Sequence, residues 1–230
     1  MFDPREATSR YEALSLKSHL QSLFAERNIT CVLDVGANIG YFGQMVRSFG
    51  YEGWLCSFEP VDVVFEKLGE TAQRDERWRV FNFALGSGEE TRSIAVAENS
   101  VLSSFLDPTD YQVSELGAMS TITQKQSVRV RTLDSVLGEC IDGISEPRLF
   151  IKVDTQGWDL EVLRGGRRAL AHTLGLQTEL SVKPLYKGMP SYVETISELT
   201  GYGFELTGLF TVIRDRALRV MELDCVMARA

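Results

Sequence analysis

The sequence Cys31-Val32-Leu33-Asp34-Val35-Gly36-Ala37-Asn38-Ile39-Gly40 decides the fold of this chain. Its first half, residues 31–35, is a short apolar run with β-branched residues, which is typical of a buried strand. From Ile39 onward, apolar residues recur at positions 42, 46 and 49, the spacing of one helix face. The stretch therefore predicts a strand, a glycine turn and a helix. Such a turn lets backbone N–H groups at the start of a helix approach a ligand closely.

The turn reads D-x-G-x-N-x-G and so differs from the glycine pattern that binds dinucleotides. Asn38 occupies a position where that pattern often has glycine, and Asp34 lies two residues before Gly36. A carboxylate there contributes little to binding a pyrophosphate, but it favours a ligand that carries an ammonium and a sulfonium. We therefore expect Asp34, Gly36, Asn38 and Gly40 to bind S-adenosyl-methionine rather than NAD. The alternative is an ordinary turn that only joins a strand to a helix.

The composition is that of an ordinary globular protein. The 230 residues are 44% hydrophobic and 24% charged, which suits one α/β domain over residues 1–230, with residues 1–28 as an N-terminal helical extension. The net charge of −8 disfavours a nucleic acid or an anionic membrane as partner.

We expect no signal peptide and no membrane span, because the N-terminus is polar and no apolar run is long enough. The four scattered cysteines indicate free thiols in a reducing cytoplasm, and the question of a homo-oligomer stays open.

Two further strands and a helix follow the glycine turn. Residues 54–58 and 78–85 have the character of strands, and the apolar spacing from Val61 indicates a helix between them. The order β-α-β-α-β predicts a parallel sheet with right-handed crossovers. Glu59 ends the second strand about 20 residues after Gly40, where a carboxylate commonly holds a ribose diol. A solvated acid at a strand end is the alternative interpretation.

A second informative stretch, residues 149–159, reads L-F-I-K-V-D-T-Q-G-W-D. It predicts a strand that ends at Asp154, then a turn and a helix over 158–171. Because chemistry in such sheets sits beyond the carboxyl ends of the strands, we expect Asp154 to stand next to the strand of Asp34. Lys152 would point to the same side as Asp154.

The rest of the chain completes the sheet. Residues 174–180 form the next expected strand, with Glu179 near its end, and residues 204–213 and 218–228 form an antiparallel hairpin. The segment 98–126 is rich in Ser, Thr and Asp and has weak periodicity. It is interpreted as a lid or substrate loop, with a mobile surface loop as the alternative.

Several motifs, in the same order along the chain, resemble the FkbM family of S-adenosyl-methionine-dependent methyltransferases. They are VLDVGANIGYF (32–42), FEP (58–60), FNFALG (81–86), a serine pair near Ser104, VRTLDSVL (130–137) and IKVDTQGWDLEVLRGG (151–166). The likeness extends over roughly residues 11–228. One departure is Gln156, where the family often has glutamate.

The resemblance implies a class I methyltransferase fold, which is a Rossmann-like α/β fold. Its seven-stranded, mostly parallel sheet has the order 3-2-1-4-5-7-6, helices on both faces and an antiparallel final hairpin. The resemblance also adds Pro60, Asn82, Ala84 and Asp154 to the expected cofactor contacts. The chemistry that it implies is O-methylation of a hydroxyl on a sugar, a glycoconjugate or another natural-product small molecule.

Transfer of a methyl group to an alcohol needs alignment of the two reactants and a base near the hydroxyl. Asp154 is the candidate base, acting directly or through a bound divalent metal. Glu179 would be a second metal ligand or a contact to the acceptor. The alternative for Asp154 is a purely architectural role in its turn. His19 and His172 lie outside every motif, so a mechanism based on histidine is not expected.

Two other functions stay open from the sequence. One is an NAD(P)-dependent oxidoreductase, against which the glycine turn and the missing Tyr-x-x-x-Lys pair argue. The other is a non-catalytic module that binds the cofactor.

Overall fold

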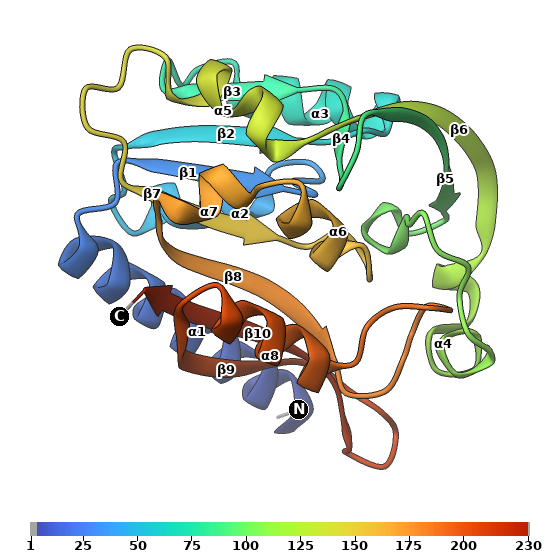
Figure 1. Cartoon of the computed structure of the whole chain (residues 1–230). Coiled ribbons are helices and arrows are strands. Elements are labelled where there is room, and N and C mark those ends of the chain that lie inside the picture. The colour runs from blue at the N-terminus through green and yellow to red at the C-terminus, as the bar shows by residue number, and fades with distance from the viewer. Residues whose placement is uncertain (1–3, 230) are drawn as a thin grey trace.

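The computed structural model describes residues 4–229, and its centre is a seven-stranded sheet (Figure 1). The strands of this sheet are β1 (Cys31–Val35), β2 (Trp54–Phe58), β3 (Trp78–Phe81), β7 (Leu149–Val153), β8 (Thr173–Ser181), β9 (Phe204–Arg214) and β10 (Val220–Arg229). Their order in the sheet is β3-β2-β1-β7-β8-β10-β9. The first five strands in this order are parallel, and β10 runs antiparallel to both of its neighbours. Because parallel strands end at the same edge, the turns after β1, β2, β7 and β8 meet there.

A second sheet lies between β3 and β7 in the chain and was not part of the expected order. It consists of β4 (Ala84–Leu85), β5 (Glu90–Ala97) and β6 (Ile122–Arg131), paired as β4-β6-β5. This insertion adds three strands to the chain and shifts the labels of the later ones. Numbered among themselves, the seven strands of the main sheet follow the expected order 3-2-1-4-5-7-6. The strand expected over 78–85 is two strands in two sheets. Between them, the Asn82 side chain donates to the carbonyl oxygens of Glu59 and Pro60 (3.2 and 3.4 Å).

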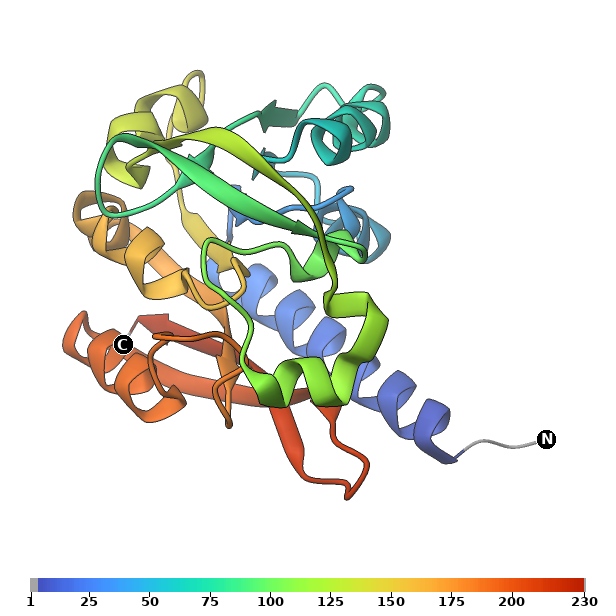
Figure 2. The same ribbon diagram turned by 90° about the vertical axis from the view of Figure 1, so that its right-hand side faces the viewer.

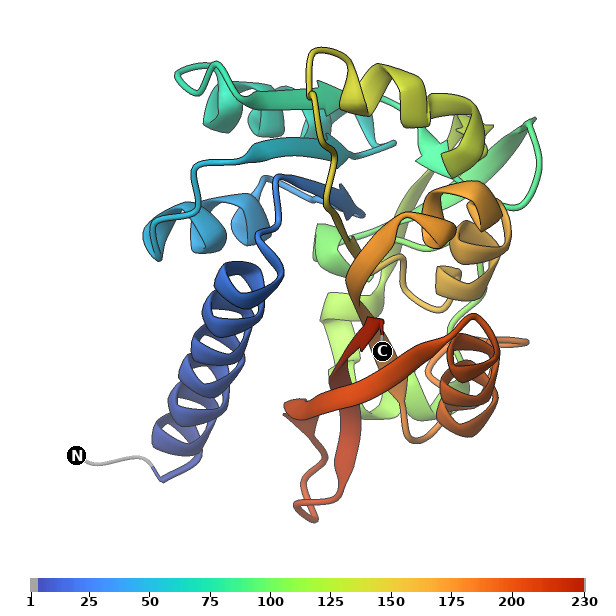
Figure 3. The ribbon, with the colours of Figure 1, turned by 60° about the vertical axis from the view of Figure 1, so that its left-hand side comes forward.

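Helices cover both faces of the main sheet (Figures 1 and 3). They are α1 (Pro4–Arg27), α2 (Tyr41–Ser48), α3 (Asp62–Ala72), α5 (Leu133–Ile141), α6 (Asp159–Arg164), α7 (Arg167–Ala171) and α8 (Tyr192–Gly201). One apolar cluster joins α1, α2 and α3 to the sheet, and another joins α5, α6, α7 and α8 to it. The helix expected over 158–171 is two helices. They separate at Gly165, which packs so closely on the backbone of Gly86 that a side chain would not fit.

The long helix α1 stands beside β9, as Figure 3 shows. Two polar contacts fix this arrangement. Arg214 Nη2 lies 3.0 Å from Glu12 Oε1, and His19 Nε2 lies 3.0 Å from Thr207 Oγ1. Within the described residues, α1 occupies the segment expected as a helical extension. No helix of residues 4–229 has the length and apolar character needed to cross a lipid bilayer.

The segment 98–126 contains short helices, where the sequence indicated irregular structure. These are η1 (Ser100–Leu102), α4 (Asp110–Leu116) and η2 (Gly117–Ser120), and β6 begins within the segment. The segment is tied to the loop after β8, since Thr109 N donates to Leu185 O and Lys187 N donates to Asp107 O, each at 2.8 Å. Figure 2 faces the carboxyl edge of the main sheet and shows β5, β6 and α4 in front of it. The segment is thus placed where a lid would lie, and its function as a lid stays a prediction.

Candidate active site

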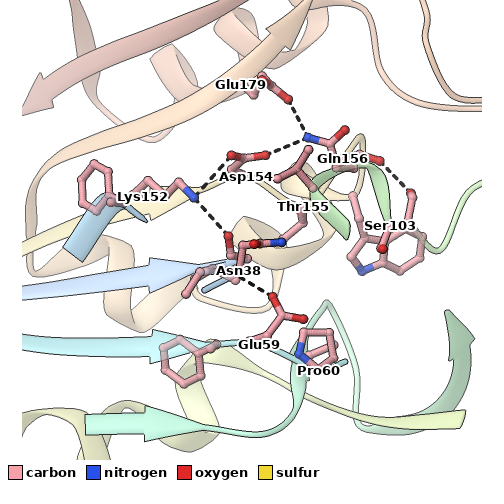
Figure 4. A pocket seen from close by; sticks show the side chains of 18 of the residues that line it. Asn38, Glu59, Pro60, Ser103, Lys152, Asp154, Thr155, Gln156 and Glu179 are labelled. Atoms are coloured by element: carbon pink, nitrogen blue, oxygen red, sulfur yellow. Dashed lines mark hydrogen bonds and ion pairs between the residues drawn. The ribbon is translucent and has the colours of Figure 1, made fainter. Parts of the chain in front are cut away.

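A cavity of about 440 Å³ opens at the carboxyl ends of β1, β2, β7 and β8 (Figure 4). This volume is in the range of small-molecule sites. The predicted site residues that line it are Gly36, Asn38, Glu59, Pro60, Ala84, Asp154 and Glu179. Three predicted residues do not line it, namely Asp34, Gly40 and Asn82. The strand ends therefore bring most of the predicted residues together from four distant parts of the chain.

The glycine turn after β1 forms one wall of the cavity. Gly36 has a φ of +76° and lies against the carbonyl group of Asp154, so that a side chain at this position would collide with it. Asn38 also has a left-handed conformation (φ +49°), and its side-chain amide donates to Ser100 Oγ at 3.0 Å. Gly40 instead faces α3 and Trp78 at the start of α2. Its expected contact with the cofactor is not supported, because its place is in the packing of two helices.

Glu59 projects from the end of β2 into the same wall. Its Oε2 accepts a hydrogen bond from Asn38 N (3.0 Å) and its Oε1 accepts one from Val61 N (2.9 Å). Burial raises the pKa of Glu59 to about 7, although both backbone bonds act in the opposite direction. Each carboxylate oxygen can accept a further hydrogen bond, which suits a ribose diol. Asn82 stabilises this corner from outside the cavity through the carbonyl bonds described above.

A row of polar side chains crosses the floor of the site. The strand register pairs Ser57 with Asp34, Asp34 with Lys152, and Lys152 with Gln177. Asp34 is 0% exposed, and Ser57 Oγ donates to its Oδ2 at 3.2 Å. The expected direct contact of Asp34 with the ligand is therefore replaced by a contact with Lys152. The sequence did not reveal this pairing, because it depends on which residue of β7 lies opposite Asp34.

Lys152 connects the buried floor with the cavity. Its Nζ lies 3.4 Å from Asp34 Oδ1 and 3.4 Å from Asp154 Oδ2, and it donates to Gly36 O at 3.2 Å. Burial alone would lower the pKa of Lys152, but the carboxylates of Asp154 and Asp34 hold it above its ordinary value. The ammonium therefore stays charged, and it holds Asp154 in place at the edge of the cavity.

Gln156 links the two predicted catalytic carboxylates (Figure 4). Its Nε2 donates to Asp154 Oδ1 at 2.9 Å and to Glu179 Oε2 at 3.0 Å, while its Oε1 accepts from the Tyr186 hydroxyl at 2.8 Å. Ser104 Oγ donates to the backbone oxygen of Gln156 at 2.7 Å. Burial, followed by neighbouring carboxylates, raises the pKa of Glu179 well above its ordinary value. Every hydrogen-bonding group of the Gln156 side chain is thus used to orient the site.

The donor set does not fit the divalent metal that the sequence left open. The amide NH₂ of Gln156 lies between Asp154 and Glu179, where a cation bound by both would have to sit. Hard divalent cations are bound by oxygen ligands, whereas an amide N–H group is a hydrogen-bond donor and cannot be a ligand to a cation. Residues 4–229 contain no group of three or more His, Cys, Asp or Glu side chains placed to hold a metal ion. No reaction step is assigned to a metal at this site.

Three further residues of the site were not predicted individually from the sequence. Gln177 and Asp224 line the cavity, and Tyr186 supports it from the loop after β8. Gln177 could have been found from its alternation with Glu179 on one strand. Asp224 could not, because the antiparallel pairing of β10 with β8 brings it opposite Glu179.

Comparison with known proteins gives one family and many similar folds. The family described as methyltransferase FkbM domain matches residues 34–206. No curated protein matches the chain in sequence. Magnesium protoporphyrin IX methyltransferase from Synechocystis PCC 6803, solved with bound S-adenosyl-methionine, is 9% identical with a TM-score of 0.50, and the match covers 100% of this chain and 86% of that one. The METTL16 methyltransferase domain is 11% identical, with a TM-score of 0.50 and coverages of 95% and 68%.

A third similar structure is fibrillarin from Aeropyrum pernix with natively bound S-adenosyl-methionine. It is 10% identical with a TM-score of 0.46, and the match covers 86% of this chain and 66% of the fibrillarin chain. Likenesses at such low identity show the fold alone, which is the α/β fold of class I methyltransferases with a mostly parallel central sheet.

Proposed function

The chain belongs to the FkbM methyltransferase family, and on this premise we propose that it is an S-adenosyl-methionine-dependent O-methyltransferase. Its acceptor would be a hydroxyl of a sugar, a glycoconjugate or another natural-product small molecule. The observation that carries the proposal is that one cavity is lined by the glycine turn, by Glu59 and by the carboxylate of Asp154. The glycine turn and Glu59, which we call the cofactor half, thus share one cavity with the proposed proton acceptor Asp154.

The cofactor half of the cavity has the features that a nucleoside needs. Glu59 would hold the ribose hydroxyls, and the apolar side chains of Phe83, Ala84 and Leu85 would contact the base from the opposite side. The turn backbone at Gly36–Asn38 would contact the amino-acid portion. When bound, S-adenosyl-methionine supplies a methyl group activated by its sulfonium, so that transfer breaks the S–CH₃ bond, forms an O–CH₃ bond and frees the hydroxyl proton.

Asp154 is proposed to accept that proton. Its side chain lines the cavity and is 37% exposed, so a substrate hydroxyl can reach it. Lys152 and Gln156 each contact one of its oxygens, which limits the rotation of the carboxylate. A fixed base near the hydroxyl is what an alcohol needs to become an adequate nucleophile. Glu179, held through the same amide of Gln156, is proposed to contact the acceptor.

The segment 98–126 is proposed to form the outer wall of the acceptor half. Ser103, Ser104 and Phe105 line the cavity, and the Ser104 hydroxyl is bonded to the turn after β7. A movement of this segment would therefore change access to Asp154 directly, and closure of such segments excludes water from the reacting groups.

The proposal is tested by calorimetry on the full chain with S-adenosyl-homocysteine and, separately, with NAD. We expect S-adenosyl-homocysteine to bind and NAD not to bind. A labelled methyl group should then pass from S-adenosyl-methionine to a hydroxylated compound in a mixed pool of sugars and glycosides. Binding of NAD alone would indicate the oxidoreductase, and binding of S-adenosyl-homocysteine without any transfer would indicate the non-catalytic module.

A further inference from the structure

The carboxyl end of β8 and the middle of the antiparallel strand β10 place three hydrogen-bond acceptors at one end of the cavity. Gln177 and Glu179 alternate on β8, and Asp224 of β10 pairs with Glu179 in the antiparallel register. All three side chains line the cavity. Because paired and alternate positions share one face of a sheet, these side chains form a common surface.

One atom of this surface lacks a partner. Gln177 Nε2 donates to Asp224 Oδ1 at 2.8 Å, but Gln177 Oε1 accepts no hydrogen bond from the described part of the chain. The residue is only 4% exposed. A buried acceptor without a donor destabilises the folded protein, so its presence beside a cavity points to a ligand group that donates to it.

The charges at this end are also unbalanced. Among the residues that line the cavity, Lys152 is the one cation, and its ammonium is engaged by Asp34, Asp154 and Gly36. Glu179 and Asp224 receive single bonds from the neutral amides of Gln156 and Gln177. Carboxylates that are removed from water are stable when a cation or several donors compensate them. Within residues 4–229, neither Glu179 nor Asp224 forms an ion pair, and Lys152, which lowers the pKa of Asp224, has its ammonium paired with Asp34 and Asp154.

Resting on the function proposed above, we propose that the acceptor carries a protonated amine close to its reacting hydroxyl, as an amino sugar does, and that Asp224, Glu179 and Gln177 Oε1 bind this amine. An ammonium has three N–H donors and one positive charge, which matches three acceptors that include two carboxylates. A neutral hydroxyl in its place would offer one donor and no charge. The apolar side chains of Leu16 and Val212, which also line the cavity, would contact the carbon skeleton.

The test uses the full chain saturated with S-adenosyl-homocysteine and two probes, glucosamine and glucose, which differ by an amine in place of one hydroxyl. Binding is measured by ligand-observed NMR titration. We expect glucosamine to bind more tightly than glucose by about tenfold or more, the size of a charged hydrogen bond. Asp224→Asn should remove this preference. Equal affinities, tighter binding of glucose, or no binding of glucosamine would each overturn the proposal.

A matched control distinguishes the loss of a carboxylate that lines the cavity from the loss of a buried carboxylate elsewhere on β10. Glu222 is a buried carboxylate two residues away on β10, it accepts from Ser181 Oγ, and it does not line the cavity. Glu222→Gln should therefore keep the preference for glucosamine. The affinity for S-adenosyl-homocysteine is measured for every variant. If Asp224→Asn weakens it, Asp224 belongs to the cofactor half and the amine proposal fails. If the unaltered chain does not bind S-adenosyl-homocysteine, the proposed function itself fails.

Discussion

Glu59 is the residue whose ionisation should control cofactor binding. Only the ionised carboxylate can accept hydrogen bonds from both ribose hydroxyls, and burial raises its pKa to about 7. Below that pH the free protein must release a proton before it binds, so the affinity for S-adenosyl-homocysteine should fall by up to about tenfold per pH unit. Calorimetry between about pH 6 and pH 8 measures this. Glu59→Gln should bind more weakly and without this dependence; an unchanged pH profile in the variant would assign the titration to another group.

Asp154 gives the second prediction at the scale of residues. Asp154→Asn keeps the size of the side chain and one oxygen that Gln156 or Lys152 can still contact, but it removes the proposed base. Turnover should fall by about 10²- to 10⁴-fold, while the affinity for S-adenosyl-homocysteine stays within about threefold. Asp62→Asn, at an exposed position in the first turn of α3, is the control and should retain turnover. If cofactor affinity falls together with turnover in Asp154→Asn, the architectural role of Asp154 is the correct one.

At the scale of elements, α1 is an integral layer of the fold. Leu20 is 0% exposed and packs in the cluster that joins α1 and α2 to the sheet, whereas Leu14 on the same helix is 65% exposed. Leu20→Ala should lower the free energy of unfolding by about 2–5 kcal/mol, and Leu14→Ala by less than about 0.5 kcal/mol. Urea unfolding of both variants measures the difference. Equal small effects would mean that α1 contributes little to the stability of the domain.

At the scale of the whole molecule, the fold buries several carboxylates together. Burial raises the pKa of Asp159 and of Glu222 to about 7, as it does for Glu59, and that of Asp224 to about 6. Between about pH 4.5 and pH 7 the folded chain keeps protons that the unfolded chain has lost, so folding takes up protons there. The free energy of unfolding should therefore decrease as the pH rises through this window, by up to about 1.4 kcal/mol per group and unit of pKa difference.

Urea unfolding of the ligand-free protein at a series of pH values checks this sign. Carboxylates whose pKa is lowered, such as Glu161 and Glu198, change their contribution below about pH 4.5 and leave the window unaffected. A rise in stability with pH across the window would contradict the prediction.

We also propose that residues 1–230 form one domain, because both apolar clusters pack on the same sheet. A single unfolding transition is the expected result.

The sequence by itself determined the parts of this protein that depend on neighbours along the chain. Apolar runs and helical spacing located β1, β2, β7 and the helices that follow them. The glycine turn, Glu59 and Asp154 could be placed at the site because each follows directly on a strand end, and parallel strands end at one edge. These local signals sufficed for the mostly parallel sheet and for most of the residues in the proposed cofactor half of the cavity.

Only the tertiary structure decided what lies opposite what. Asp34 has the same sequence signal whether it faces a ligand or a lysine, and the register of β1 with β7 placed Lys152 against it. The pairing of β10 with β8 likewise brought Asp224 beside Gln177, although α8 and β9 separate these two residues along the chain. The physical reason is that charges compensate one another in space, and contacts between strands depend on a register that one stretch of sequence does not contain.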